Sequence, residues 1–380
     1  MRDCRKHYQS PLARPYSRRP DPAEAVFISK KDMEALPLLV SPKASMPKIS
    51  VVVSCYNKSE TIGGCVISVL QQDVGEFETI VVDDGSTDGS LQILTDLAFK
   101  NSLKLIAGDH RGISSTKNRG FAVSNGEIVL FLDGDCVLEK GSLEELAKSF
   151  DEGAVDCVGG EVRAANSSRS IARAVEIMQN DIERKWPFGA NVAYSRKALL
   201  KAGLFDERMT AGEDAELYLR ARKLGFKSII NGKVVARTNN PDNLVSFFCQ
   251  RLNWGKGFRQ LTERHPETFT TKIKRCFLWI LVMLLSPLVA MIDIQFTWAF
   301  PALAAYNLLR FTPGTIAFYR RTRDRKHCII IPFLRFVNAL AYFLGWIYWY
   351  AIELAGRAKA LEPFLPEPAG DNPFPVDLPT

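Results

Sequence analysis

The feature that most constrains this chain is a short apolar run that ends in two closely spaced carboxylates. Residues 128–132 read Ile-Val-Leu-Phe-Leu, and Asp133, Gly134 and Asp135 follow directly. Five uninterrupted apolar residues are too few for an amphipathic helix, so the run predicts a strand buried on both faces. α/β proteins bind ligands at the carboxyl ends of parallel strands, and Asp-x-Asp there offers hard oxygen ligands to Mg²⁺ or Mn²⁺. A plain turn is the alternative, because Asp and Gly are ordinary turn residues.

The stretch before this run repeats one pattern of an apolar strand, a polar loop and a helix. The segments that predict strands are 49–55, 77–82 and 103–107, and a helical segment follows each. This β-α-β order predicts a mostly parallel sheet covered by helices, with the polar loops along one edge. The first loop lacks G-x-G-x-x-G, which argues against an ordinary dinucleotide-binding fold.

Three apolar segments stand in the last third of the chain. Residues 276–292 and 296–311 are almost wholly apolar, and 328–355 contains a proline, an arginine and an asparagine. The first two are slightly shorter than the ~20 residues that a spanning helix prefers. Two short membrane spans joined by a hairpin fit best, with a re-entrant pair as the alternative. Whether the third segment spans stays open, because a charged residue at mid-bilayer is costly.

Basic residues flank these apolar segments. The net charge of +7 comes partly from an Arg-rich amino-terminal tail and partly from clusters at 272–275 and 320–326. This pattern favours an anionic membrane surface, and not nucleic acid, as the partner. The positive-inside rule places both clusters in the cytoplasm. We therefore expect a multi-pass protein of the cell membrane with its α/β domain on the cytoplasmic side.

These composition changes divide the chain into five parts. Residues 1–47 predict a disordered basic tail rich in proline, and 48–260 predict the α/β domain. A basic juxtamembrane linker covers 261–275. The membrane region, of two to three helices, covers 276–355, and 356–380 form a Pro-rich tail.

Seven short motifs follow one another within the α/β domain. In chain order they are SCYN at Ser54–Asn57, DDGSTD at Asp83–Asp88, KNRG at Lys117–Gly120, LDGD at Leu132–Asp135, GANVAYSR at Gly189–Arg196, GLFDE at Gly203–Glu207 and GED at Gly212–Asp214. In this order they resemble the family 2 glycosyltransferases of the GT-A fold, of the membrane-anchored, non-processive type. The resemblance implies a Rossmann-like, mostly parallel sheet flanked by helices, a nucleotide-diphosphate sugar as donor, and Mn²⁺ or Mg²⁺ as cofactor.

The resemblance also implies which residues bind the donor and the cation. Binding of the nucleotide sugar is implied for Tyr56, Asp83, Asp84, Lys117, Arg119 and Asp133. Among these, Lys117 and Arg119 would face the diphosphate, although a solvated helix face is an equal alternative for Lys117. Asp135 would bind the metal directly, with Asp133 contacting the metal or the ribose.

On the acceptor side the resemblance implies a general base and two binding residues. Asp214 would remove the acceptor proton, with Glu213 beside it, while the acceptor attacks the anomeric carbon from the face opposite the leaving diphosphate. The implied outcome is inversion of the anomeric centre. Asn191 and Trp254 would lie on the acceptor side, with a structural hydrogen bond as the alternative for Asn191.

One departure from the family's motifs bears on whether the product is a polymer or a single transferred sugar. Processive members of the family carry Q-x-x-R-W, whereas this chain has Asn253 between Gln250 and Trp254. We therefore expect transfer of one sugar to a lipid-linked acceptor, such as a polyprenyl or dolichyl carrier, or to a glycan. The alternatives are a processive polysaccharide synthase, a haloacid dehalogenase-like phosphatase with Asp133 as nucleophile, and a non-catalytic membrane scaffold.

Overall fold

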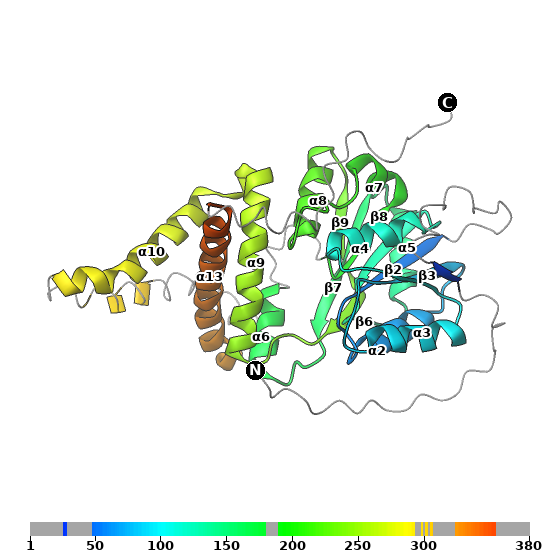
Figure 1. Cartoon of the computed structure of the whole chain (residues 1–380), viewed down its shortest axis with the longest axis horizontal. Helices are drawn as coiled ribbons and strands as arrows, with labels where there is room; N and C mark the ends of the chain where they lie inside the picture. Colours follow the sequence, from blue (N-terminus) through cyan, green and yellow to red (C-terminus); the bar gives the residue numbers. More distant parts are fainter. Residues whose placement is uncertain are drawn as a thin grey trace.

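The computed structural model shows an α/β domain beside a group of long helices (Figure 1). It describes residues 26–28, 48–179, 189–292, 298, 301–302, 305–306 and 324–354. Most of the predicted amino-terminal tail, most of the apolar segment 296–311 and the carboxyl-terminal tail lie outside these residues. Within the tail that was predicted to be disordered, Val26–Ile28 form a strand that pairs in parallel with Lys104–Ile106.

The described strands form one mixed sheet of nine strands. Their order is β1-β4-β3-β2-β5-β8-β7-β9-β6. The strands are β1 (Val26–Ile28), β2 (Ile49–Cys55), β3 (Phe77–Asp83), β4 (Lys104–Ala107), β5 (Ile128–Asp133), β6 (Val137–Leu138), β7 (Cys157–Ala164), β8 (Asn191–Ser195) and β9 (Ser228–Thr238). The β1-β4-β3-β2-β5 part is parallel, as the sequence predicts. The β8 strand runs antiparallel to both β5 and β7.

Helices cover both faces of this sheet. They are α2 (Ile62–Leu70), α3 (Ser90–Lys100), α4 (Ile113–Ala122), α5 (Ser142–Glu152), α6 (Ser170–Gln179), α7 (Arg196–Ala202) and α8 (Glu213–Lys223). Successive residues of a strand point to opposite faces. Val51 and Val53 therefore pack in the core under α2, α3 and α5, whereas Val52 packs with Phe121 and Leu217 in the core under α4, α7 and α8.

The strand register brings the polar loops to one edge. Cys55 at the end of β2 lies beside Asp83 of β3, and Ser54 lies beside Asp133 of β5. The turn after β5 lies so close to β2 that a Cβ atom on Gly134 would be 2.7 Å from the Ser54 carbonyl oxygen. Glycine is therefore required between the two aspartates, because any side chain would push this turn away from β2.

The long helices pack on one another beside the domain. They are α9 (Leu244–Arg264), α10 (Thr271–Ile292) and α13 (Arg325–Leu354), with the short 3₁₀ helix η3 (Pro266–Thr268) between α9 and α10. Gly255 of α9 faces the backbone of Tyr342, and Gly345 of α13 faces the backbone of Leu252. Small residues at such positions let two helix backbones approach closely. The α13 helix therefore returns to the domain and lies along α9 (Figure 1).

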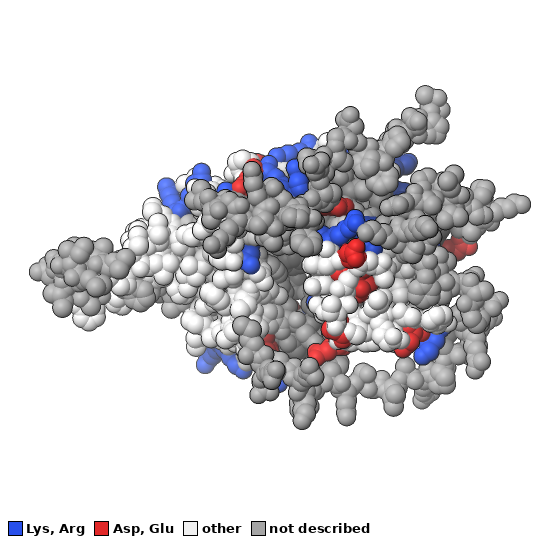
Figure 2. Space-filling model, in the orientation of Figure 1, with Lys and Arg blue, Asp and Glu red and all other residues white. Residues whose placement is uncertain are grey.

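The membrane prediction is supported only in part. Among the described residues, one helix is long and apolar enough to cross a bilayer, the stretch Arg325–Ile352 with a mean hydropathy of 1.8. The α10 helix buries Phe277 and Ile280 against α13 but exposes Leu278 and Leu285 at 57% and 46%. In Figure 2 the surface over these helices is largely white, which means that few charged side chains lie there. The structure supports one candidate span, and the predicted set of two to three membrane helices is not confirmed.

Candidate functional site

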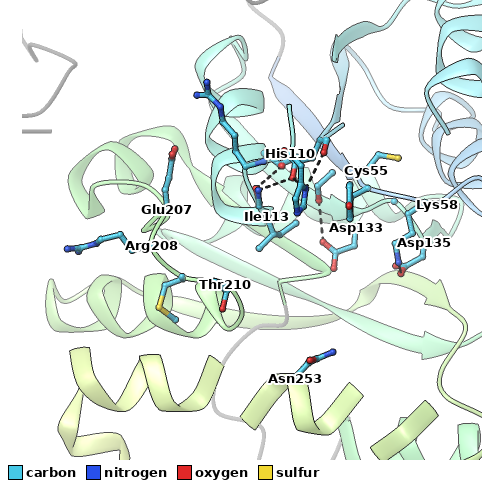
Figure 3. Close-up of a pocket in the computed structure, with 18 of the residues that line it drawn as sticks. Cys55, Lys58, His110, Ile113, Asp133, Asp135, Glu207, Arg208, Thr210 and Asn253 are labelled. Carbon is cyan, nitrogen blue, oxygen red and sulfur yellow. Dashed lines mark hydrogen bonds and ion pairs between the residues drawn. The ribbon is translucent and has the colours of Figure 1, made fainter. Parts of the chain in front are cut away.

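A cavity of about 1030 Å³ opens at the carboxyl edge of the sheet. Its walls come from the strand ends, from the loops that follow them, and from helices α9 and α13. Residues that represent these walls are Tyr56, Asp133, Asp135, Asn253, Gln260 and Trp349. Figure 3 shows Asp133, Asp135 and Lys58 on one side of this cavity, with Glu207 and Arg208 on the opposite side. The volume matches that of a small-molecule site.

Asp84 organises one wall of the cavity. Asp84 is buried, and its two carboxylate oxygens accept hydrogen bonds of 2.9 Å from the backbone N–H groups of Arg111 and Gly112. His110 Nδ1 lies 2.7 Å from Asp84 Oδ2, and its ring stacks on Tyr56 with 4.0 Å between centroids. The result is an aromatic surface, held by a buried carboxylate, on the side where the resemblance places the nucleotide base.

Asp83, the residue before Asp84, is fully buried and does not line the cavity, but it has an unused hydrogen-bond acceptor. Its Oδ2 atom accepts a hydrogen bond of 3.0 Å from the Ser86 N–H group. Its Oδ1 atom is buried without a hydrogen-bond partner among the described residues. A buried carboxylate oxygen without a donor is costly, so this atom is suited to accept a hydrogen bond from a ligand.

Asp133 and Asp135 face the cavity from the end of β5. Asp135 Oδ2 forms an ion pair with Lys58 Nζ, and both side chains are about one-third exposed, at 33% and 38%. Asp133 Oδ1 accepts a hydrogen bond of 3.4 Å from Ser54 Oγ and lies 3.7 Å from Lys117 Nζ. Burial raises the pKa of Asp133, and the charge of Lys117 offsets only part of that rise.

These two carboxylates fit a divalent cation that arrives with a substrate. No cluster of three or more His, Cys, Asp or Glu side chains in the described part of the chain would hold an ion by itself. Mg²⁺ and Mn²⁺ commonly bind through one or two carboxylates, several waters and the phosphates of the substrate. The Asp135 carboxylate already attracts a cationic group, the ammonium of Lys58. Its position therefore suits a positive charge.

Lys117 lies neither at the cavity, where it would face a diphosphate, nor on a solvated helix face. Its side chain is only 1% exposed, and its ammonium lies 2.9 Å from Glu213 Oε1 and 3.4 Å from the Gly189 carbonyl oxygen. Burial lowers the pKa of Lys117, but Glu213, Asp133 and Asp214 reverse this and raise it above its usual value. The solvated helix face is wrong, and the ammonium contacts the carboxylates of Glu213 and Asp133 instead of the cavity.

Asp214 lies next to this buried group. Its Oδ2 atom accepts a hydrogen bond of 2.7 Å from the Gly189 N–H group, and a Cβ atom on Gly189 would be 2.7 Å from Asp214 Cβ. Burial and the neighbouring Glu213 raise the pKa of Asp214 to about 6. Neither acid is part of the cavity wall that the described residues form. Residues 180–188, which precede Gly189 in the chain, lie outside the described part.

Two other predicted site residues, Arg119 and Trp254, lie away from the cavity wall. Arg119 packs its guanidinium against Gly108, 3.9 Å from Asp84 Oδ1, so it supports the loop after β4 instead of facing the cavity. Trp254 stacks under the guanidinium of Arg251 at 3.9 Å. The neighbouring residue on α9, Asn253, is the one that reaches the cavity.

The predicted acceptor-side role of Asn191 is not what the structure shows. Asn191 is fully buried, and its Nδ2 atom donates hydrogen bonds to the carbonyl oxygens of Val234 and Glu161, at 3.1 and 3.3 Å. These bonds join β8 to the irregular pairing of β7 and β9 at Gly160 and Glu161. The structural alternative is therefore correct for Asn191.

Sequence reasoning missed several residues of the cavity, among them Lys58, His110 and Trp349. Lys58 directly follows the SCYN motif, so its position after the first strand was a usable signal. His110 has no such signal, because the hydrogen bonds of the chain bring it to Asp84 across 26 residues. Trp349 lies within a segment whose composition indicates only a membrane helix, and packing of α13 on α9 brings it to the site.

Fold and site together define an α/β protein with an acidic edge that opens into a ligand-sized cavity. Residues 50–208 match the model of the family described as Glycosyl transferase family 2. The fold also resembles that of a mannosyltransferase from Pyrobaculum calidifontis, solved in complex with GDP-Man and Mn²⁺. The TM-score is 0.52 and the identity 19%, over 83% of this chain and 92% of that one.

Characterised relatives agree with the family match. Glycosyltransferase AglE of Haloferax volcanii is 27% identical over 194 residues, which cover 48% of this chain and 64% of the relative. The poly-beta-1,6-N-acetyl-D-glucosamine synthase of Staphylococcus epidermidis is 25% identical over 273 residues, covering 67% and 65%. The chain thus spans slightly less than two thirds of the length of these two relatives.

Residues 50–208 therefore carry a glycosyltransferase family 2 domain, and the α/β domain has the GT-A fold. This confirms the predicted family and fold, whereas the membrane-anchored, non-processive type is not confirmed.

Proposed function

We propose that this protein is an inverting glycosyltransferase that moves one sugar from a nucleotide-diphosphate sugar to a membrane-associated acceptor. The observation that carries the proposal is the meeting of Asp84, Asp133 and Asp135 around one cavity at the carboxyl edge of the sheet. The family 2 domain supports the reaction type. The cation is Mg²⁺ or Mn²⁺, which the two carboxylates at the end of β5 would hold.

The donor half of the cavity is suited to a nucleoside diphosphate. The stacked rings of Tyr56 and His110 offer a surface for the base, and Asp83 Oδ1 offers a buried acceptor for a base N–H or a ribose hydroxyl. Asp133 and Asp135 would hold the cation. A bound divalent cation supplies positive charge that offsets the charge growing on the leaving diphosphate.

The general base in this proposal is Asp214. Its raised pKa of about 6 lies near the working pH, where a carboxylate both exists and accepts a proton well. The Lys117 ammonium links the neighbouring Glu213 to Asp133, because it contacts both carboxylates. Attack by the deprotonated acceptor from the side opposite the diphosphate inverts the anomeric centre.

The long helices support an acceptor at a membrane surface. Trp349 on α13 and Asn253 on α9 line the same cavity as the acidic edge, and α13 is the candidate membrane span. An acceptor carried on a lipid would thus reach the cavity along the helices that hold the protein to the bilayer. We propose a cytoplasmic domain of residues 48–260, joined to a membrane region within 276–355, and Asn253 in place of arginine favours single transfer over polymer synthesis.

Replacing Asp135 with Ala should remove the cation-dependent part of donor binding. We expect the Mn²⁺-dependent affinity for UDP or GDP to fall roughly 100-fold, as loss of a metal-site group does. Isothermal calorimetry with and without Mn²⁺ measures this. Asp151→Ala is the matched control, because Asp151 forms a surface ion pair with Lys48 far from the cavity. Undiminished Mn²⁺-dependent affinity in Asp135→Ala would contradict the metal site.

Replacing Trp349 with Ala should weaken acceptor binding and leave donor binding unchanged. Loss of one aromatic contact predicts a rise of about 10-fold in the acceptor KM. Steady-state kinetics with a polyprenyl phosphate as acceptor, and separately with varied donor, measure the two effects. Tyr348→Ala is the control, because Tyr348 is 53% exposed and does not line the cavity. An equal rise in the donor KM would contradict an acceptor role.

A further inference from the structure

We propose that Lys58 is the internal counter-ion of the cation site: it holds Asp135 before the divalent cation binds, and it is then released to the donor diphosphate. This inference rests on the proposed function and adds a residue and an order of events to it. Lys58 belongs to none of the motif positions that the family resemblance assigns.

The backbone around Lys58 is fixed while its side chain is not. The Lys58 N–H group donates to Ser90 Oγ at 2.8 Å, and Asn57 Oδ1 accepts a 2.8 Å hydrogen bond from the Thr87 N–H group. Asn57 itself has a φ angle of 52°, which a short amide side chain tolerates. The loop after β2 is thus fastened to the loop after β3. The flexible four-carbon side chain of Lys58 starts from this fixed point at the cavity edge.

Lys58 is the lysine that is free to move at this acidic edge. Lys117, which contacts Asp133, is 1% exposed and also bonded to Glu213, so its ammonium is locked in place. Lys58 is 38% exposed and lines the cavity, and its ammonium pairs with Asp135. An ion pair with this exposure is worth little free energy and is easily exchanged.

The charges of the site require an exchange when a cation binds. Asp135 Oδ2 contacts the Lys58 ammonium, so a divalent cation at that oxygen would stand against a like charge. The ammonium must therefore leave. Its three donors match the oxygens of a phosphate group, and the cation itself arrives with a diphosphate. Released Lys58 thus moves from one set of oxygens to another within the same cavity.

The pairing of Lys58 with Asp135 also lowers charge repulsion at the acidic edge. Asp133 and Asp135 are separated by a single glycine, and two nearby carboxylates repel each other. Lys58 offsets part of this repulsion by pairing with the Asp135 carboxylate. This arrangement lowers the affinity of the site for free cations, because every cation that binds has to displace the Lys58 ammonium.

The test is a comparison of Lys58→Met with the wild-type full-length protein. Removing the competing ammonium should tighten Mn²⁺ binding in the absence of nucleotide by about 5-fold, the upper end for a partly exposed ion pair. Removing the phosphate contact should weaken UDP or GDP binding at saturating Mn²⁺ by about 10-fold. Electron paramagnetic resonance of free Mn²⁺ measures the first quantity, and calorimetry measures the second.

Two further variants make the result specific. Lys48→Met is the matched control, because Lys48 forms a similar surface ion pair with Asp151, and it should change neither affinity. Lys58→Arg keeps the positive charge and should keep Mn²⁺ affinity near the wild-type value. Thermal melting of each variant shows that it is folded.

The outcomes separate this inference from the proposed function. Unchanged Mn²⁺ affinity in Lys58→Met would overturn the counter-ion role, and tighter Mn²⁺ binding with unchanged nucleotide affinity would overturn the release to the diphosphate. Wild-type protein that binds no nucleotide with Mn²⁺ would instead overturn the proposed function itself, and the inference with it.

Discussion

Replacing Asp214 with Asn is expected to lower the turnover number by about 10³-fold, the usual contribution of a general base. Asparagine has almost the same shape and can still accept the hydrogen bond from the Gly189 N–H group. Affinity for UDP or GDP with Mn²⁺ should therefore stay within about 2-fold of wild type, because no donor contact is removed. Single-turnover kinetics and calorimetry on the same preparation measure the two quantities.

The pH dependence gives this prediction a second readout. Burial and Glu213 raise the pKa of Asp214 to about 6, and a base must be deprotonated. The wild-type rate should fall as the pH drops through about 6 and level off above it. The stability effect has the opposite sign: a raised pKa favours the folded state at low pH, and this contribution is lost as the pH rises through about 6. Because asparagine does not titrate, the rate of Asp214→Asn should not show this fall near pH 6.

A surface variant serves as the control for Asp214. Asp242→Asn changes an exposed carboxylate near the start of α9 and should leave both turnover and its pH profile unchanged. Near-normal turnover in Asp214→Asn would remove this residue as the base, and a base on residues 180–188 or on the acceptor itself would then have to be sought.

Replacing Lys117 with Met is expected to cost roughly 3–5 kcal/mol of folding free energy, the usual cost of breaking one side of a buried ion pair. Lys117 is 1% exposed, so solvent does not screen its contacts with Glu213 and Asp133. Methionine fills a similar volume but leaves these carboxylates without their cation. Denaturant unfolding, followed by the tryptophan fluorescence of the protein in detergent, measures the loss.

Lys148→Met is the control for Lys117→Met. It removes a lysine from a surface ion pair with Glu144 and should leave the unfolding midpoint unchanged. A Lys117→Met protein that unfolds at the wild-type denaturant concentration would show that Glu213 and Asp133 do not need this cation. The Lys117 ammonium would then contribute little to the folding free energy.

The edge of the sheet was predictable because it depends on local pattern. Each β-branched or apolar run predicts a strand, and the polar residues after 49–55, 77–82 and 128–132 had to meet once those strands became parallel neighbours. The positions of Asp84 and Asp135 at the cavity follow from this alone. For that part of the site, strand order and register decide the outcome.

The remaining contacts depend on partners far away in the chain, which no local pattern reveals. The partner of Lys117 is Glu213, 96 residues later, so a lysine on a helix gave no sign of burial. Asn191 is held by β9 only because β8 inserts antiparallel between β5 and β7, an order that the parallel prediction did not include. Hydropathy of 328–355 left open whether this segment spans the membrane, and it could not reveal that α13 packs along α9.

The return of α13 to α9 has a consequence for how the protein is made. Gly255 and Gly345 let the two helices touch, and Trp349 completes the cavity only once α13 is in place. During synthesis the ribosome has to translate at least as far as Trp349 before this wall exists. The nascent chain therefore carries a cavity that is open on this side until α13 has packed along α9.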